Sequence, residues 1–253
     1  MDLKEFFSQH PKCALAFSGG TDSALLLYEA RRLGADVRAY FVKGPFQPQF
    51  ELDDARRLAG ETGAEMQVIE TDVLSVPEVA ENGPRRCYYC KRAIFSLIFE
   101  HAAQDGYETV IDGTNASDKV DDRPGMQALA ELGVLSPLRL CGITKAMVRE
   151  MSAAAGLFTA DKPSYACLAT RVPTGTPITR ADLEKIERSE NALHALGFSD
   201  FRVRLEGSGA RLELPPEQLP AVVQNRERIL KSLSVFFTRI TVDLASFHNT
   251  DLP

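Results

Sequence analysis

The chain has 253 residues, of which 44% are hydrophobic, so it is long enough for one large domain or two smaller ones with a substantial core. The formal net charge is −6, and the acidic excess lies wholly within the first 170 residues, which argues against a protein built to bind nucleic acid. No stretch approaches the ~20 apolar residues of a membrane span, and the charged N-terminus lacks the apolar core of a signal peptide. We therefore expect a cytoplasmic protein with no membrane partner.

The first predicted strand, residues 14–17, runs directly into a polar turn and then into a leucine-rich helix. The glycines of this turn can adopt positive φ and let a ligand approach the backbone, while the start of the helix presents unpaired N–H groups that suit a phosphate. We expect nucleotide binding by the whole turn: Ser18, Gly19, Gly20, Thr21, Asp22 and Ser23. The turn lacks the Gly-Lys-Ser/Thr of a Walker A loop and the third glycine of a dinucleotide fingerprint.

The turn resembles Ser-Gly-Gly-x-Asp-Ser, the signature of the PP-loop ATP pyrophosphatases, and this resemblance implies ATP as a cofactor. A carboxylate beside bound phosphates usually needs a cation between them, so Asp22 implies Mg²⁺. The alternative role of Asp22 is to cap the helix, and both roles stay open at this point.

Strands and helices then alternate in a βαβα order. Further strands are expected at 36–42, 65–70 and 109–112, and helices at 50–62, 86–103, 126–132 and 144–155. This order predicts an α/β fold with a parallel, doubly wound sheet that binds ligands at the carboxyl ends of its strands. Asp112, Thr114 and Asn115 follow one strand end, with Asp118 close behind, so we expect them around the nucleotide or its metal; the alternative is a solvated turn.

The composition of the sequence changes at residues 173–177, where two prolines and a glycine predict a linker or sharp turn. A small α+β domain is expected beyond it, with a helix at 180–196, a hairpin of strands 201–206 and 210–214, a helix at 219–233 and a strand at 235–244. The predicted domains are therefore 1–172 and 178–253.

Two arginines of this second domain, Arg202 and Arg204, alternate along a strand and so share one face. They are candidates to clamp a phosphate or carboxylate of the substrate, and the alternative is an exposed polar strand face. Glu190, Glu213 and Glu217 could bind a metal, but from the sequence we interpret them as surface residues.

The five cysteines fall into two kinds. Cys87 and Cys90 form a CxxC at a helix start, which is typical of redox exchange, a reactive thiolate or half of a metal site. Cys167 stands between Lys162 and Arg171, whose charges favour a thiolate. The remaining two, Cys13 and Cys141, are interpreted as structural.

The chain as a whole resembles the LarE family, ATP-dependent sulfur transferases of nickel-pincer-nucleotide biosynthesis. The matching stretches lie in order along nearly the whole chain and begin at Phe17 (FSGGTDS), Arg86 (RCYYCK), Asp112 (DGTN), Arg123 (RPGM), Ser136 (SPL), Ser164 (SYACLA) and Phe201 (FRVR). The resemblance implies that ATP adenylates a carboxylate of pyridinium-3,5-biscarboxylic acid mononucleotide with release of pyrophosphate, and that a sulfur nucleophile then displaces AMP to leave a thiocarboxylate. It also implies that Arg123 helps to bind the nucleotide, that Asp22, Cys167 and Arg171 are catalytic, and that the protein is a homo-oligomer.

The source of the sulfur separates two branches of this family. In one branch, the cysteine that matches Cys167 gives up its own sulfur and becomes dehydroalanine. In the other branch, three cysteines that match Cys87, Cys90 and Cys167 hold a [4Fe–4S] cluster, which leaves one iron open for sulfide. The presence of all three cysteines favours the cluster, while the sulfur donor is not identified.

Two other functions remain open. A tRNA-thiolating PP-loop enzyme would share the ATP site, although the acidic charge balance weighs against it. A nucleotide-binding sensor without turnover would leave the cysteines and Arg171 without a purpose.

Overall fold

The computed structural model describes residues 1–118 and 124–244, which divide into two compact units. The larger unit consists of residues 1–79 and 85–164, and the smaller consists of residues 80–84 and 165 onwards. The predicted domain limits, 1–172 and 178–253, stay a prediction.

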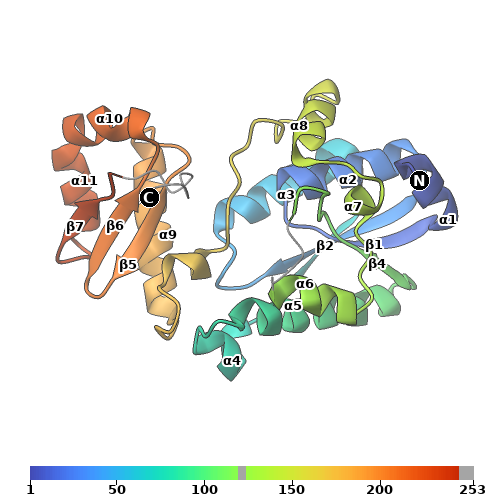
Figure 1. The fold of residues 1–253 in the computed structure, drawn as a ribbon, viewed down its shortest axis with the longest axis horizontal. Coiled ribbons are helices and arrows are strands. Elements are labelled where there is room, and N and C mark those ends of the chain that lie inside the picture. The colour runs from blue at the N-terminus through green and yellow to red at the C-terminus, as the bar shows by residue number, and fades with distance from the viewer. Residues whose placement is uncertain (119–123, 245–253) are drawn as a thin grey trace. The chain divides into compact units, whose positions relative to one another are not determined.

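The large unit is built on a four-stranded parallel sheet in the order β3-β2-β1-β4 (Figure 1). Its strands are β1 (Lys12–Ala16), β2 (Asp36–Lys43), β3 (Met66–Glu70) and β4 (Thr109–Ile111). These bounds lie close to the predicted strands, and the predicted α/β class with a parallel, doubly wound sheet is confirmed. Since β2 and β4 flank β1 on opposite sides, the strand order reverses at β1, and such a point opens a crevice at the strand ends.

Helices cover both faces of this sheet because its strands are apolar on both sides. One face packs against α1 (Leu3–Gln9), α2 (Thr21–Arg32), α3 (Gln49–Thr62), α7 (Pro137–Leu140) and α8 (Lys145–Ala154). The other face packs against α5 (Arg86–Gln104) and α6 (Pro124–Glu131). A short helix, α4 (Pro77–Ala80), precedes α5. The helices α1, α4 and α7 were not predicted, because each is too short for its apolar period to stand out.

The small unit has a three-stranded sheet of β5 (Arg202–Glu206), β6 (Gly209–Glu213) and β7 (Ile240–Val242). The predicted hairpin is confirmed: β5 and β6 run antiparallel, and Gly207 supplies a positive φ of 56° in their turn. β7 joins β6 in parallel and is much shorter than the strand predicted at 235–244.

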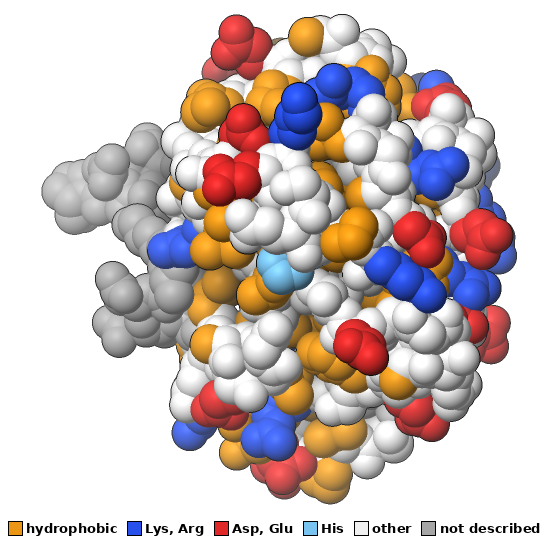
Figure 2. Space-filling view, turned by 90° about the vertical axis from the view of Figure 1, so that its right-hand side faces the viewer, with side chains coloured by type: hydrophobic (Ala, Val, Ile, Leu, Met, Phe, Trp, Pro, Cys, Tyr) orange, Lys and Arg blue, Asp and Glu red, His pale blue; other side chains and the backbone are white. Residues whose placement is uncertain are grey.

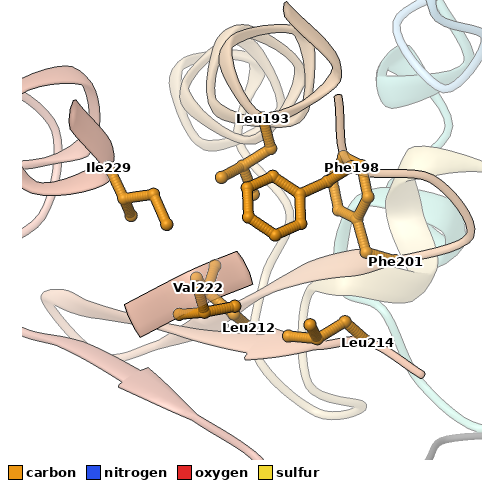
Figure 3. Close-up of a pocket in the computed structure, with 7 residues that line it drawn as sticks. All are labelled: Leu193, Phe198, Phe201, Leu212, Leu214, Val222 and Ile229. Atoms are coloured by element: carbon orange, nitrogen blue, oxygen red, sulfur yellow. The ribbon is translucent and has the colours of Figure 1, made fainter. Parts of the chain in front are cut away.

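Three helices accompany this sheet: α9 (Arg180–Ala195), α10 (Leu219–Gln224) and α11 (Arg226–Leu233). The single helix predicted at 219–233 is wrong, since Asn225 ends α10 with φ −97° and ψ 13° and also begins α11. An apolar pocket lies inside this unit (Figure 3), lined by Leu193, Phe198, Phe201, Leu212, Leu214, Val222 and Ile229. Its lining carries no charge, so it belongs to the core of the unit and not to a site for a charged nucleotide.

The segment 80–84 is attached to the small unit through Asn82, a buried residue with a left-handed φ of 57°. Its side-chain amide donates to the carbonyl oxygens of Pro173 (2.8 Å) and Thr176 (2.9 Å). The backbone adds a hydrogen bond from Gly175 N to Asn82 O of 2.8 Å. Asparagine tolerates this backbone conformation better than most residues, which explains its use here.

Candidate functional site

The polar turn between β1 and α2 forms a cradle of backbone N–H groups and hydroxyls at the point where the strand order reverses. Gly20 precedes α2, and no side chain caps the helix, so its first N–H groups are directed at the turn. The hydroxyls of Ser18 and Ser23 lie 3.1 Å apart, and Ser18 Oγ accepts from Gly20 N at 3.3 Å. This is the arrangement expected for holding phosphate groups.

The left-handed backbone of Gly19, with φ 71°, is required by the packing of this turn. A Cβ atom at Gly19 would lie only 3.0 Å from the carbonyl oxygen of Glu51 and 3.1 Å from the side chain of Ala55, both on α3. Thr21 fixes the other side of the turn, because its hydroxyl donates to Thr159 O at 2.9 Å. The turn is therefore held rigidly by its neighbours.

The turn after β4 lies directly against the polar turn of residues 18–23, the candidate phosphate turn. A Cβ atom at Gly113 would come within 2.9 Å of Ser23 N, so the two backbones are in contact. This contact follows from the pairing of β1 with β4, which brings their carboxyl ends together. The two polar clusters found in the sequence thus belong to one site.

Asp22 connects these two turns. Its Oδ1 accepts from Asn115 Nδ2 at 3.0 Å, and its Oδ2 lies 2.5 Å from Lys145 Nζ at the start of α8. Its side chain is 25% exposed, so the carboxylate reaches solvent. The alternative role of Asp22 as the helix cap is wrong, because Gly20 occupies the cap position and Asp22 lies inside the first turn of α2.

Asp112 is buried, and its carboxylate stabilises the turn after β4. Its carboxylate accepts from Ser136 Oγ at 2.6 Å and from the hydroxyl of Thr114 at 2.5 Å. Asn115 is also buried, and its backbone N–H donates to Asp118 Oδ2 at 2.9 Å. Asp112 and Asp118 therefore shape the turn, while Asn115 reaches the carboxylate of Asp22.

Two lysines of this site were not singled out as site residues from the sequence. Lys145 pairs with Asp22, and Lys162 Nζ lies 2.5 Å from Asp54 Oδ2 and 3.4 Å from the Gly19 carbonyl oxygen. A signal for Lys145 existed: it is the first residue of α8, where the helix dipole disfavours a positive charge. A charge in such a place indicates a partner or ligand that compensates for it.

The CxxC motif lies in the first two turns of α5, in the large unit. Cys87 is exposed and Cys90 is half-buried, and their i, i+3 spacing puts both on one side of the helix. Gly125 of α6 packs against this helix start, since a Cβ atom there would lie 3.3 Å from Lys91 Cδ and 3.8 Å from Cys87 Cβ. The neighbouring Arg123 lies outside the described residues.

Cys167 lies in the small unit, directly before a short 3₁₀ turn of residues Leu168–Arg171. The fully buried Arg171 ends this turn and binds Glu190 of α9, with Nε 2.9 Å from Oε1. Tyr165 donates to the same carboxylate at 2.6 Å. The loop that carries Cys167 is thus fastened to α9.

The two arginines of β5 face this same loop. Arg202 is buried with its guanidinium carbon 5.3 Å from the centre of the Tyr165 ring, so the alternative of an exposed strand face is wrong for it. Burial and the charge of Arg171 lower the pKa of Arg202. Arg204 donates to Thr170 O and binds Glu213 Oε2 at 2.8 Å.

The glutamates of the small unit are not all surface residues, as the sequence had suggested. Glu190 and Glu213 are buried and paired with arginines, whereas Glu217 is exposed. A buried carboxylate in an apolar unit needs a cationic partner. Glu190 lies 19 residues from Arg171, whereas Glu213 binds both Arg204, nine residues away, and Arg211, two residues away.

The donor chemistry of the cysteines fits an iron–sulfur cluster, because thiolates are the ligands that such clusters use. Within residues 1–118 and 124–244, no three side chains of His, Cys, Asp or Glu are grouped so as to hold a metal ion. Cys87 and Cys90 belong to the large unit and Cys167 to the small one. Among the described residues, no helix is long and apolar enough to cross a membrane.

Comparison with known proteins gives the family. No family model matches the chain. An uncharacterised protein of Synechocystis is 36% identical over 99% of this chain and 95% of its own length. The pyridinium-3,5-bisthiocarboxylic acid mononucleotide synthase of Lactiplantibacillus plantarum is 34% identical over 94% of this chain and 87% of its own length.

A more distant similarity points to the wider superfamily. The tRNA-specific 2-thiouridylase MnmA of Frankia alni is 29% identical over 58% of this chain and 52% of its own length. Both named relatives are enzymes that introduce sulfur, and the sheet with its Ser-Gly-Gly-x-Asp-Ser turn is the PP-loop arrangement. The chain therefore belongs to the LarE family of PP-loop sulfurtransferases.

Proposed function

We propose that the protein is an ATP-dependent sulfurtransferase that acts on pyridinium-3,5-biscarboxylic acid mononucleotide. The observation that carries the proposal is the contact of the two polar turns at the ends of β1 and β4, joined by Asp22, in a chain 34% identical to the bisthiocarboxylic acid mononucleotide synthase. A carboxylate oxygen is a poor leaving group, and adenylation turns it into a good one.

In the first step, a carboxylate oxygen of the substrate attacks the α-phosphorus of ATP, and the bond to the β-phosphate breaks to release pyrophosphate. The N–H groups at the start of α2 and the hydroxyls of Ser18 and Ser23 bind the leaving phosphates. Asp22 would hold Mg²⁺, and Lys145 would move from this carboxylate to the negative charge of the phosphates.

In the second step, a sulfur nucleophile attacks the acyl carbon, the bond to the AMP oxygen breaks, and a thiocarboxylate and AMP form. Cys87, Cys90 and Cys167 would hold the [4Fe–4S] cluster, which when bound supplies an iron with an open coordination position for sulfur. Arg202 and Arg204 would bind the phosphate or carboxylate of the substrate, and Arg171 would support the Cys167 loop.

The adenylation step is tested by pyrophosphate release with ATP, Mg²⁺ and the substrate. We expect Asp22→Asn and Ser18→Ala to lower the rate by about 100-fold, because each removes a polar group from the charge-stabilising site. Asp53→Asn, at an exposed position on α3, is the matched control and retains the wild-type rate. Wild-type release by both site variants would refute the assignment of the ATP site.

The sulfur source is tested by anaerobic purification followed by absorbance, iron and sulfide analysis of Cys87→Ala. We expect this variant to lose both colour and activity, while Cys141→Ala keeps both. In the sacrificial reaction, Cys87→Ala would instead complete one turnover, and the Cys167 peptide would lose the mass of one H₂S. That mass loss would refute the cluster.

A further inference from the structure

The small unit buries a complete positive charge beside Cys167. The side chain of Arg171 is 0% exposed, and it is the largest of the fully buried side chains among the described residues. Burial opposes its charge, but the charge and hydrogen bonds of Glu190 outweigh burial and raise the pKa of the guanidinium. Such a buried pair adds little net stability compared with apolar side chains of the same volume. Its presence therefore calls for a reason other than stability.

Glu190 accepts hydrogen bonds from two segments of the unit and so joins them to its own helix. From the Cys167 loop it accepts Arg171 Nε at 2.9 Å, Arg171 Nη2 at 3.2 Å and the Tyr165 hydroxyl at 2.6 Å. From β5 it accepts the backbone N–H of Val203 at 3.0 Å. Glu190 itself lies on α9. With four donors on its two oxygens, this carboxylate is occupied by protein groups.

The other end of Arg171 fixes the backbone on both sides of the cysteine. Its Nη1 donates to the carbonyl oxygen of Ala166 at 2.7 Å and approaches that of Cys167 at 3.4 Å. The Cys167 carbonyl also accepts from the Thr170 hydroxyl at 2.9 Å and from Thr170 N at 3.0 Å. The peptide planes next to Cys167 are therefore held in place, and they determine where its side chain starts.

We propose that Glu190 is a positioning residue for sulfur transfer, which orients Cys167 by holding Arg171 and Tyr165. The inference rests on the proposed function of Cys167, since a cysteine that takes part in group transfer must be aligned with the reacting carbon. In this proposal, Glu190 binds side chains and backbone of the protein and is not a metal ligand.

The test compares the alkylation rates of individual cysteines in the 253-residue chain after treatment with an iron chelator. The rates are measured with iodoacetamide and peptide mass spectrometry, so neither ATP nor substrate is needed. In Glu190→Gln we expect Cys167 to react at least about threefold faster relative to Cys87, because the loop that carries Cys167 is loosened. Cys87 lies in the other unit and serves as the internal reference.

Two measurements separate this effect from unfolding of the small unit. Amide hydrogen exchange at Leu212, in the middle of β6, should stay as slow as in the wild type. Glu190→Asp, which keeps the charge, should restore most of the wild-type Cys167 rate. Glu184→Gln, at an exposed position of α9, is the matched control and should change neither rate.

Tyr165→Phe gives a second variant that removes only one donor from Glu190. We expect it to raise the Cys167 rate by less than Glu190→Gln and to lower thiocarboxylate formation as well. The proposal is overturned if iodoacetamide alkylates Cys167 of a folded Glu190→Gln or Tyr165→Phe protein at the wild-type rate. Since this readout needs no catalysis, failure of the positioning role is distinguishable from failure of the proposed function, which pyrophosphate release reports.

Discussion

At the residue scale, the polar groups of the proposed nucleotide site act mainly on one another. Asp112 binds Ser136 and Thr114, while Asp22 binds Asn115 and Lys145. Only some of these groups can therefore be displaced by a ligand. We expect a ligand to separate the partly exposed Asp22–Lys145 ion pair, since separating such a pair costs less free energy than separating a buried one.

Cys13 provides a residue-scale prediction about thiol reactivity. Burial, with a smaller contribution from Asp36, raises the pKa of its thiol to about 12. The group therefore stays protonated across neutral pH and up to pH 9, and its side chain is fully buried in β1. We expect no alkylation of Cys13 in the native protein at pH 8 and rapid alkylation in urea.

The exposed Cys87 is the control in the same sample, because it should react in both conditions. Labelling of native Cys13 at the rate of Cys87 would contradict the interpretation of Cys13 as a structural residue.

At the element scale, several of the candidate site residues lie where helices begin. The starts of α2, α5 and α8 carry, in turn, the phosphate turn, the CxxC motif and Lys145. The starts of α2 and α8 come together because both helices pack on the same face of the sheet, whereas α5 packs on the other face. The strand order then decides which turns meet, since β1 and β4 are neighbours.

Gly113 gives an element-scale prediction about the contact between the two turns. In Gly113→Ala, the new methyl group would lie 2.9 Å from Ser23 N, so the turn after β4 must move away from the phosphate turn. We expect the affinity for ATP to fall by at least about tenfold, because small displacements of positioned groups are costly. Isothermal titration calorimetry measures the affinity.

The matched control is Gly60→Ala in α3, where a Cβ atom meets nothing within 4 Å. This variant should bind ATP normally and unfold at slightly higher temperature, because alanine favours the helix by about 0.5–1 kcal/mol over glycine. Equal ATP affinity of the two variants would argue against a role for the close contact.

At the scale of the whole molecule, the proposed chemistry is divided between two units. The nucleotide turns and the CxxC motif belong to the large unit, while Cys167, Arg171, Arg202 and Arg204 belong to the small one. On the face in Figure 2, basic and acidic side chains of the described residues are interspersed. The expectation of a small-molecule substrate, and not a nucleic acid, rests on the net charge of −6.

The resemblance to the LarE family also predicts a homo-oligomer, which concerns the whole molecule. We expect sedimentation equilibrium to give a mass that is a multiple of 27.8 kDa over a wide range of concentration. A purely monomeric protein at every concentration would contradict this expectation. The charge variant Asp53→Asn is a suitable control, because its exposed position should leave the mass unchanged.

The sequence by itself determined the elements whose signals are local. The alternation of apolar strands with amphipathic helices predicted the parallel sheet, and the glycines and serines of residues 18–23 predicted the turn between β1 and α2. The ends of elements were less well determined: the single helix predicted at 219–233 is interrupted at Asn225, and the last strand is shorter than predicted.

Only the tertiary structure decided which distant residues are partners. Lys145 is 123 residues from Asp22, and Arg171 is 19 residues from Glu190, so no local spacing relates either pair. Long-range pairing depends on strand order and on burial, which a periodic pattern does not encode. A carboxylate such as Glu190 therefore resembles a surface residue in the sequence, until the fold removes it from water and a buried arginine becomes its required partner.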